Sequence, residues 1–205
     1  QKVQTVLIGV SDDRGVGLSG GRLGAVEGPQ QFRDHFWRMN APESLARGSI
    51  LDAGDMVSAA RTNETHARLT EVIDVLRDRF CEAKMVVVGG GHDHVYGEVL
   101  GVARWLRKQS GSRDIKLAHI SCDARANVHS VQGEPNASGA LKRLLLEPSA
   151  QLDGKSLVIW GLQRALTADK HMAFLRAHGV PIHSWEAIEE DPRRAAGQLV
   201  AKICS

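Results

Sequence analysis

The sequence of 205 residues is 42% hydrophobic and 24% charged, which is ordinary for a globular protein. It is long enough for one domain with a full hydrophobic core. Its 26 lysines and arginines nearly balance 24 acidic residues and form no basic run, which argues against a nucleic-acid partner. The longest apolar runs are far too short for a membrane span, and the strand-like start carries no secretion pattern. Three cysteines at wide, irregular spacing fit reduced thiols, so we expect a cytoplasmic protein.

Short apolar runs alternate with amphipathic segments along the chain, which is the pattern of a parallel sheet flanked by helices. The runs are rich in β-branched residues and lack alternation, for example at Val86-Val87-Val88, as expected when helices cover both faces of a sheet. The expected strands are 3–10, 49–54, 84–89, 115–122, 156–162 and 181–185. No internal repeat or linker interrupts them, so residues 1–205 are predicted to form a single domain.

Apolar residues at three- and four-residue spacing indicate the helices. One stripe runs from Leu69 to Phe80, and another runs from Val95 to Leu106 before Gly111. Three further helices are expected near residues 29–39, 167–179 and 192–203, the second of them capped by Thr167.

Residues 15–20 read Gly-Val-Gly-Leu-Ser-Gly and match the glycine pattern of dinucleotide-binding loops. Such a loop must follow a strand directly and open a helix, whose N–H groups then meet the pyrophosphate. Here residues 11–14 intervene, two of them acidic, and the next expected helix begins only near Pro29. We therefore interpret the segment as a glycine-rich loop that forms the rim of a ligand site.

Two segments carry the residues best suited to chemistry. Residues 88–97 lead from a buried strand through three glycines to His92, Asp93 and His94 at a helix start. Residues 119–129 end the next strand and contain Asp123 and His129. Because the carboxyl ends of parallel strands open on the same edge of a sheet, we expect His92 and Asp123 to converge.

These segments resemble the ureohydrolase family, which includes arginases, agmatinases and formimidoylglutamases, and they look most like the formimidoylglutamases. The resemblance is carried by residues 13–33, by Gly-Gly-Gly-His at 89–92, and by Asp123-Ala124 followed by Ser138-Gly139. A weaker echo is Trp-Gly-Leu-Gln at 160–163. The resemblance implies an α/β fold, a three-layer α/β/α sandwich with a mainly parallel, arginase-like sheet that here lacks the last two strands.

Members of the family hydrolyse guanidino or formimino C–N bonds with water held between two manganese ions. Their ligands are a histidine after the glycines, an Asp-x-His-x-Asp cluster and a later Asp-x-Asp pair. By this resemblance His92 and Asp123 match two ligands, whereas Arg125 and Asn127 stand where the family has a histidine and an aspartate. The Asp-x-Asp pair has no counterpart in residues 1–205.

These substitutions change the charge of the site. The family balances four positive charges with four carboxylates, whereas Asp123 supplies one and Arg125, which stays protonated, cancels it. A guanidinium about 4 Å from a dication is repelled by roughly 8 kcal/mol at an effective dielectric of 20. We therefore expect no metal cofactor, and manganese only if the family chemistry survives. The alternative is a replacement cluster of His92, His94, Asp123 and His129.

Structural roles are also open to these residues. His92 can bond to the backbone at a helix start, and Asp123 can cap its loop or pair with Arg125. His94 is expected on the solvated side of its helix. Cys122 is expected to be an inert core thiol.

The predicted rim of a ligand site lies in the loops that follow the strands, and comprises Asp13, Arg22, Ser138 and Gly139. Ser138-Gly139 also fits a loop that leads into a helix. Asp12, Asp13 and Arg22 are the polar residues least expected of a purely structural loop.

Two classes of function follow. The first is a metal-deficient homologue, close to formimidoylglutamase, that binds a small molecule or a protein partner without turnover. The second is an active hydrolase of histidine degradation that converts N-formimino-L-glutamate to glutamate and formamide, with a rebuilt site or with residues supplied elsewhere. A homo-oligomer is expected in either case.

The family places the two missing strands in the middle of its sheet, between the third and fourth strands of this chain. A gap there would leave two apolar strand edges unpaired, which proteins avoid. We therefore predict that 84–89 pairs directly with 115–122, giving the order 2-1-3-4-5-6 and bringing His92 and Asp123 within roughly 10 Å.

Overall fold

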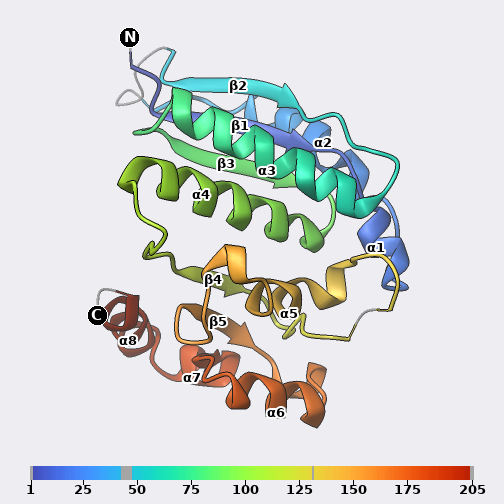
Figure 1. Ribbon diagram of the computed structural model, residues 1–205, viewed down its shortest axis with the longest axis vertical. Coiled ribbons are helices and arrows are strands. Elements are labelled where there is room, and N and C mark those ends of the chain that lie inside the picture. Colours follow the sequence, from blue (N-terminus) through green and yellow to red (C-terminus); the bar gives the residue numbers. More distant parts are fainter. Residues whose placement is uncertain (1, 43–47, 131, 204–205) are drawn as a thin grey trace.

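The computed structural model describes residues 2–42, 48–130 and 132–203 (Figure 1). The strands are β1 (Thr5–Val10), β2 (Ile50–Asp55), β3 (Lys84–Gly89), β4 (His119–Cys122), β5 (Leu157–Leu162) and β6 (Ile182–Ser184). The helices are α1 (Arg14–Leu18), α2 (Gly28–Phe36), α3 (Thr62–Arg79), α4 (Val95–Ser110), α5 (Ala140–Leu145), α6 (Asp169–Ala177), α7 (Trp185–Glu190) and α8 (Pro192–Ile203). Two short 3-10 turns also matter for the site, η2 (His92–His94) and η3 (Ala137–Gly139).

The strands form two parallel groups of three, in the orders β2-β1-β3 and β4-β5-β6. In the first group Val6 lies between Leu51 and Met85, and in the second Ile120 lies beside Val158. Helices α3 and α4 lie in front of the upper strands in Figure 1 and α2 lies behind them. The predicted parallel α/β sandwich is therefore confirmed.

The predicted direct pairing of the third and fourth strands is wrong, because among the described strands β3 pairs with β1 and β4 pairs with β5. Val86 and Ile120 on these two strands remain 40% and 38% exposed. The prediction assumed that two apolar strand edges would close on each other. The structure leaves them unpaired, at the place where the family resemblance puts two strands that have no counterpart in residues 1–205. Helix α4 packs against α3 on one side and α5 on the other, and so connects the two strand groups.

Several element boundaries also differ from expectation. The fourth strand begins at His119 rather than at residue 115, and the glycine-rich segment after β1 forms the short helix α1 instead of an open loop. Thr167 does not cap α6, which begins at Asp169 with Ala168 as its N-cap residue. The hydroxyl of Thr167 instead donates to the carbonyl oxygen of Gln163.

Two apolar clusters form the core. The smaller one joins β1 to α3 through Ile8, Val10, Leu69 and Ile73. The larger one surrounds β5, and its fully buried members include Leu141, Leu144, Leu157, Ile159 and Leu175. Each strand group therefore has its own cluster, and burial of such side chains contributes about 1.5–3 kcal/mol each.

Close packing of α4 on α3 depends on two glycines. A Cβ atom at Gly97 would lie 2.7 Å from the carbonyl oxygen of His66, and one at Gly101 would lie 2.6 Å from the Cβ of Ile73. The hydroxyl of Thr70 donates to the carbonyl oxygens of both His66 and Gly97, so it joins the two helices. This contact fixes the start of α4 against the first half of α3.

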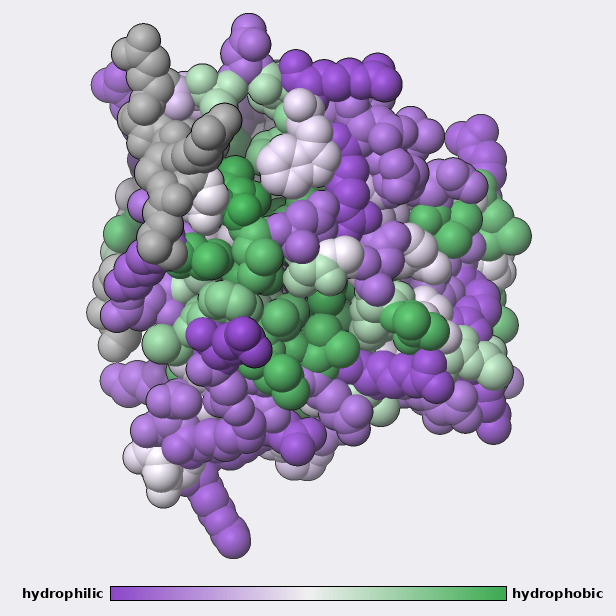
Figure 2. Space-filling view, turned by 90° about the horizontal axis from the view of Figure 1, so that it is seen from above, coloured by the Kyte–Doolittle hydropathy of each residue, from purple (hydrophilic) through white to green (hydrophobic). Residues whose placement is uncertain are grey.

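The surface on the β2 side of the molecule carries a concentration of apolar side chains (Figure 2). A groove of about 420 Å³ there is lined by β1, the end of β2 and α3, and includes Met56, Val72 and Leu76. Val57 beside it is 76% exposed. No helix in the described part of the chain has the length and apolar character needed to cross a membrane.

The close approach of α3 and α4 gives a direct test. We expect Gly101→Ala to lower the free energy of unfolding by about 1–2 kcal/mol, because the steric cost exceeds the gain in helix propensity of about 1 kcal/mol. Gly197→Ala in α8 is the matched control, since an added Cβ there meets nothing within 4 Å. Urea unfolding of both variants measures the difference. A Gly101→Ala protein as stable as the Gly197→Ala protein would show that α3 and α4 do not pack as described.

Candidate functional site

His92 follows β3 and Asp123 follows β4, and the negative charge of Asp123 acts on His92. Burial lowers the pKa of His92, and the negative charges of Asp123 and Asp93 oppose this lowering. Burial also lowers the pKa of His119 to about 4, and His92 adds to the effect. Both imidazoles are therefore neutral near pH 7. The expected separation of roughly 10 Å between His92 and Asp123 assumed that β3 and β4 are adjacent strands. Because these strands do not pair, that estimate no longer applies.

Three buried polar atoms in this region lack a hydrogen-bond partner among the described residues, namely His92 Nε2, His119 Nε2 and Ser121 Oγ. His119 and Ser121 are two residues apart on β4 and so project on the same side of the strand. A buried polar atom left unpaired costs about 1–3 kcal/mol. A ligand bound in this region could supply the hydrogen bonds that these three atoms lack.

The carboxylate of Asp123 is held by its own loop. Its Oδ1 accepts from the backbone N–H of Arg125 at 2.9 Å, and its Oδ2 accepts from Asn127 Nδ2 at 2.6 Å. Asn127 adopts a left-handed backbone conformation with φ of 47°, which asparagine tolerates better than most residues. The guanidinium of Arg125 lies in an exposed position. Asp123 therefore caps the loop that follows β4, as one of the sequence alternatives proposed.

The predicted replacement cluster does not assemble. His94 is 2% exposed, so its expected place on the solvated side of the helix is wrong. His129 is exposed and its ring lies against His171, with 4.1 Å between ring centroids. Among the described residues, one group of three His, Cys, Asp or Glu side chains has ligand atoms within 4.8 Å of each other, and it consists of His66, Asp93 and His94.

The residues predicted to form the rim of a ligand site differ in their burial and in their contacts. Asp13 is nearly buried, and its Oδ2 accepts from the backbone N–H groups of Gly24 and Val26, so it holds the turn after α1. Arg22 is exposed. Ser138 and Gly139 form the η3 turn, which contacts α1. Asp13 thus has a structural role that the sequence did not indicate.

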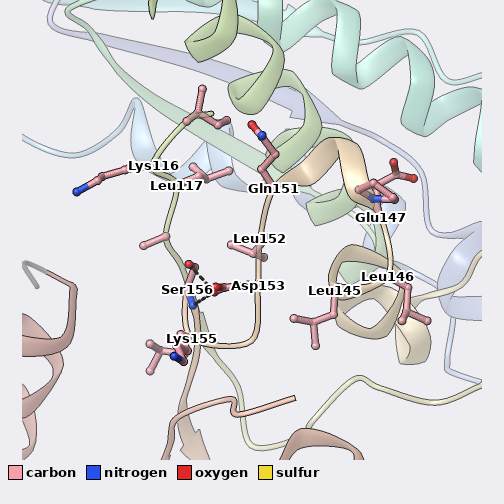
Figure 3. A pocket seen from close by; sticks show the side chains of 14 residues that line it. Lys116, Leu117, Leu145, Leu146, Glu147, Gln151, Leu152, Asp153, Lys155 and Ser156 are labelled. Carbon is pink, nitrogen blue, oxygen red and sulfur yellow. Dashed lines mark hydrogen bonds between the residues drawn. The ribbon is translucent and has the colours of Figure 1, made fainter. Parts of the chain in front are cut away.

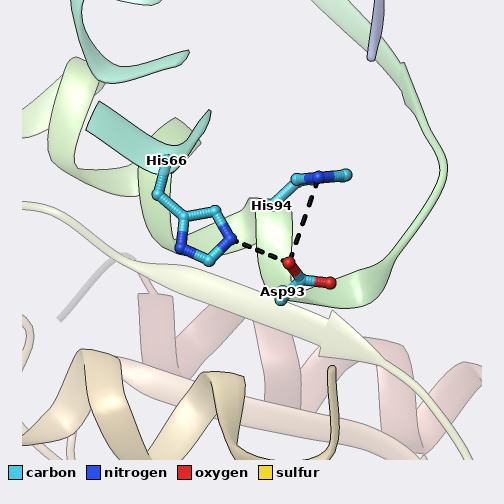
Figure 4. A group of neighbouring side chains, drawn as sticks. All are labelled: His66, Asp93 and His94. Atoms are coloured by element: carbon cyan, nitrogen blue, oxygen red, sulfur yellow. Dashed lines mark hydrogen bonds and ion pairs between the residues drawn. The ribbon is translucent and has the colours of Figure 1, made fainter. Parts of the chain in front are cut away.

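The three side chains of the His66–Asp93–His94 group are nearly inaccessible, with 1%, 2% and 2% of their residue surfaces exposed (Figure 4). His66 comes from α3, and the other two come from the η2 turn that begins α4. His66 Nε2 lies 2.8 Å from Asp93 Oδ2, and His94 Nε2 lies 4.0 Å from the same oxygen. The tight α3–α4 contact described above places these groups together.

Arg143 on α5 completes the surroundings of His66. Its Nη1 lies 2.8 Å from His66 Nδ1. Because a guanidinium can only donate, His66 Nδ1 accepts this bond and Nε2 carries the proton that is donated to Asp93. The guanidinium also lies 3.4 Å from the ring centroid of Tyr96, whose hydroxyl donates to Glu147. Burial lowers the pKa of Arg143, but the group remains a cation.

A second ion pair lies beside this group. Asp12 is 5% exposed and pairs with Arg14, which also donates to the hydroxyl of Thr65 on α3. Burial opposes the effect of Arg14, yet the pKa of Asp12 is lowered because the guanidinium and the backbone N–H of Arg14 both bond to it. Asp12, for which the sequence indicates no role, therefore joins the end of β1 to α3 through Arg14.

Sequence reasoning missed His66, although a signal was present. His66 precedes Leu69 by three residues and Ile73 by seven, so it lies on the same buried stripe of α3. A histidine on the apolar face of a helix must find polar partners when it is buried. The partners are Asp93 and Arg143, which come from later segments that helical spacing alone does not indicate.

Two features lie apart from these groups. A cleft of about 940 Å³ is lined by the residues just before β4 and β5 and by the segment after α5, including Leu117, Leu152 and Lys155 (Figure 3). It is at the opposite end of β4 from Asp123, and it gathers no cluster of catalytic type. Cys122 is exposed rather than buried in the core as expected, because β4 has no neighbour on its β3 side.

Relatives share this fold and sequence pattern. The formimidoylglutamase of Streptococcus gordonii is 32% identical over 164 residues, which cover 78% of this chain and 47% of that protein. The formimidoylglutamase of Lysinibacillus sphaericus is 29% identical over 168 residues, covering 80% and 47%. The chain thus spans about half the length of the curated relatives it matches.

Solved structures match over almost the whole chain. Formiminoglutamase from Trypanosoma cruzi with Mn²⁺ aligns with a TM-score of 0.82 at 23% identity, covering 99% of this chain and 67% of that one. Formimidoylglutamase from Bacillus subtilis aligns with a TM-score of 0.84 at 19% identity, covering 99% and 62%. The model of the arginase family matches residues 3–204, and the chain belongs to that family.

Proposed function

We propose that this chain is a formimidoylglutamase-like member of the arginase family whose two-metal site is lost, and that it acts without C–N bond hydrolysis. The observation that carries this proposal is the state of Asp123. Both of its carboxylate oxygens are bonded to donors in its own loop, one of them the amide of Asn127. Asn127 turns its NH₂ group, which is not a metal ligand, toward the one carboxylate that remains.

The residues present do not fit a pair of manganese ions. His92 Nε2 and His119 Nε2 are unpaired imidazole atoms that a metal would accept as ligands. The family resemblance implies aspartates at positions 123 and 127 of this loop, and here only the first is a carboxylate, because residue 127 is an asparagine. Arg125 between them adds a positive charge. Hard divalent ions require several oxygen donors, and two dications need their charge balanced. One carboxylate does not supply either.

A second candidate function is an active amidine hydrolase completed by residues beyond those described. The open edges of β3 and β4 favour it, because unpaired strand edges at the centre of a fold are sites for additional strands. Residues beyond those described would also supply hydrogen-bond partners or a metal for the buried polar atoms of His92, His119 and Ser121, which have no partner among the described residues. Substrates of this candidate are N-formimino-L-glutamate or a related guanidino compound, as the names of the relatives suggest.

An activity assay separates the two candidates. We expect the purified protein, supplied with Mn²⁺, to release formamide from N-formimino-L-glutamate and urea from arginine or agmatine at background rates. Without a metal-bound water of lowered pKa there is no strong nucleophile at neutral pH. Steady release that disappears in Asp123→Ala would overturn the proposal. The double variant Arg125→His with Asn127→Asp is expected to stay inactive, because the later carboxylate pair remains absent from residues 1–205.

The loop itself gives a test based on stability. Asn127→Asp places a second carboxylate where the 2.6 Å bond to Asp123 now lies, and this raises the pKa of one member of the pair. A raised folded-state pKa gives stability that is present at low pH and lost as pH rises through it. We therefore expect the variant to match the parent near pH 3.5 and to lose about 1–2 kcal/mol at pH 8.

The control for this loop variant is Asn127→Gly, which loses the same hydrogen bond, tolerates the positive φ and adds no charge. Because the amide of Asn127 favours the ionised form of Asp123, its loss costs somewhat more at pH 8 than at pH 3.5, but this change should be smaller than that of the aspartate variant. Equal pH profiles for the aspartate and glycine variants would show that Asn127 and Asp123 do not face each other as described.

A further inference from the structure

We propose that His66, Asp93 and His94 form a binding site for one transition-metal ion such as Zn²⁺, and that Arg143 opposes the binding of this ion. Two imidazoles and a carboxylate are a common ligand set for zinc. The ligand atoms lie within 4.8 Å of one another. Ligands around a tetrahedral ion with bonds of about 2.1 Å are about 3.4 Å apart, so the longest distance in the group needs to contract by about 1.4 Å.

Unsatisfied groups support the site. Asp93 Oδ1 is a buried carboxylate oxygen without a hydrogen-bond partner among the described residues, and His94 Nδ1 is a buried ring nitrogen in the same state. Asp93 is confined by glycines, since a Cβ at Gly15 or Gly91 would lie 2.2 Å from its carboxylate oxygen. The backbone therefore encloses this carboxylate closely while leaving one oxygen unbonded. A metal ion bound by both carboxylate oxygens of Asp93 would give Oδ1 a partner and remove that cost.

The chemistry of the ligands selects the kind of ion. Imidazole nitrogens suit Zn²⁺, Co²⁺ and Ni²⁺, whereas Mg²⁺ and Ca²⁺ prefer oxygen ligands, of which this group offers only one residue. A pocket of about 280 Å³ reaches His66 and Asp93 and is lined on its other side by His129, Lys142 and Arg143. This pocket is the path by which an ion would reach the buried group.

Arg143 is the element that opposes the ion. Its guanidinium donates to His66 Nδ1, so the Nε2 proton of His66 points at Asp93. Coordination through Nε2 requires that this proton leave for solvent and that Nδ1 take one up, with no net change in protons. A protonated Nδ1 and a guanidinium at 2.8 Å are both donors, so Arg143 must withdraw. Its cationic charge also repels the arriving dication.

The site is separate from the position that the family resemblance implies. His92 and Asp123 are not members of this group, and His66 matches none of the family ligand positions. The proposed metal site is therefore independent of whether the chain hydrolyses amidines. A negative result for the metal site does not decide the proposed function, and the reverse also holds.

The test is a titration of the purified, metal-free protein with Zn²⁺ by calorimetry, and with Co²⁺ by visible absorption. We expect one saturating site per chain. His66→Ala and Asp93→Asn should weaken binding at least tenfold, since each removes a ligand. His92→Ala and His171→Ala should bind as the parent does, because they belong to the family position and to the other close histidine pair.

Arg143 provides the matched pair of variants. Arg143→Gln should bind Zn²⁺ about tenfold more tightly, because the amide oxygen can accept from Nδ1–H and such supporting bonds change affinity by about 10–100-fold. Arg143→Lys keeps the charge and the donor and should bind as weakly as the parent. These variants leave the three ligands in place, so they keep the test decisive if His66→Ala fails to fold. Absence of saturable binding in both the parent and Arg143→Gln would overturn the proposal, as would binding that is lost in His92→Ala or His171→Ala.

Discussion

Helix α4 lies against α3 at a distance that only glycine permits at two successive turns, and much of the molecule is arranged around this contact. Gly97 and Gly101 let the backbone of α4 approach His66 and Ile73. The start of α4 therefore lies on α3, and Asp93 and His94 meet His66. On its other side α4 contacts α5, which carries Arg143. One helix thus links the two strand groups.

Charge balance decides what the carboxyl edge can bind. The edge offers the neutral histidine His92 and a single carboxylate at Asp123 that is already bonded within its loop, while the neutral His119 lies at the start of β4. Neutral imidazoles do nothing to offset the four positive charges of two manganese ions. On the proposed function, the single carboxylate Asp123 is too little charge for two dications at this edge. His66, Asp93 and His94 form a separate, compact group with one carboxylate and two imidazoles.

The sequence predicted the strands, α3, α4 and the fold class well, because runs such as Val86-Val87-Val88 and the Leu69–Phe80 stripe record local burial directly. It failed where the outcome depends on distant packing. β3 and β4 do not pair, although the apolar pattern of both strands is compatible with direct pairing, so the local pattern does not decide which strands are neighbours. The apolar pattern of its own helix predicts a solvent-exposed His94. The structure buries it against Asp93 and against His66 from another helix. The altered positions Arg125 and Asn127 could be read from the resemblance, but the bond from Asn127 to Asp123 required the structure.

The most direct test of the central claim is a crystal of the protein soaked in Mn²⁺, with anomalous scattering recorded at the manganese absorption edge. The account predicts no pair of anomalous peaks between His92 and Asp123, and hydrogen bonds from Arg125 and Asn127 to Asp123 that persist in the soaked crystal. Two peaks bridged by Asp123, with the amide of Asn127 turned away, would contradict it and would show that the two-metal site of the arginase family survives in this chain.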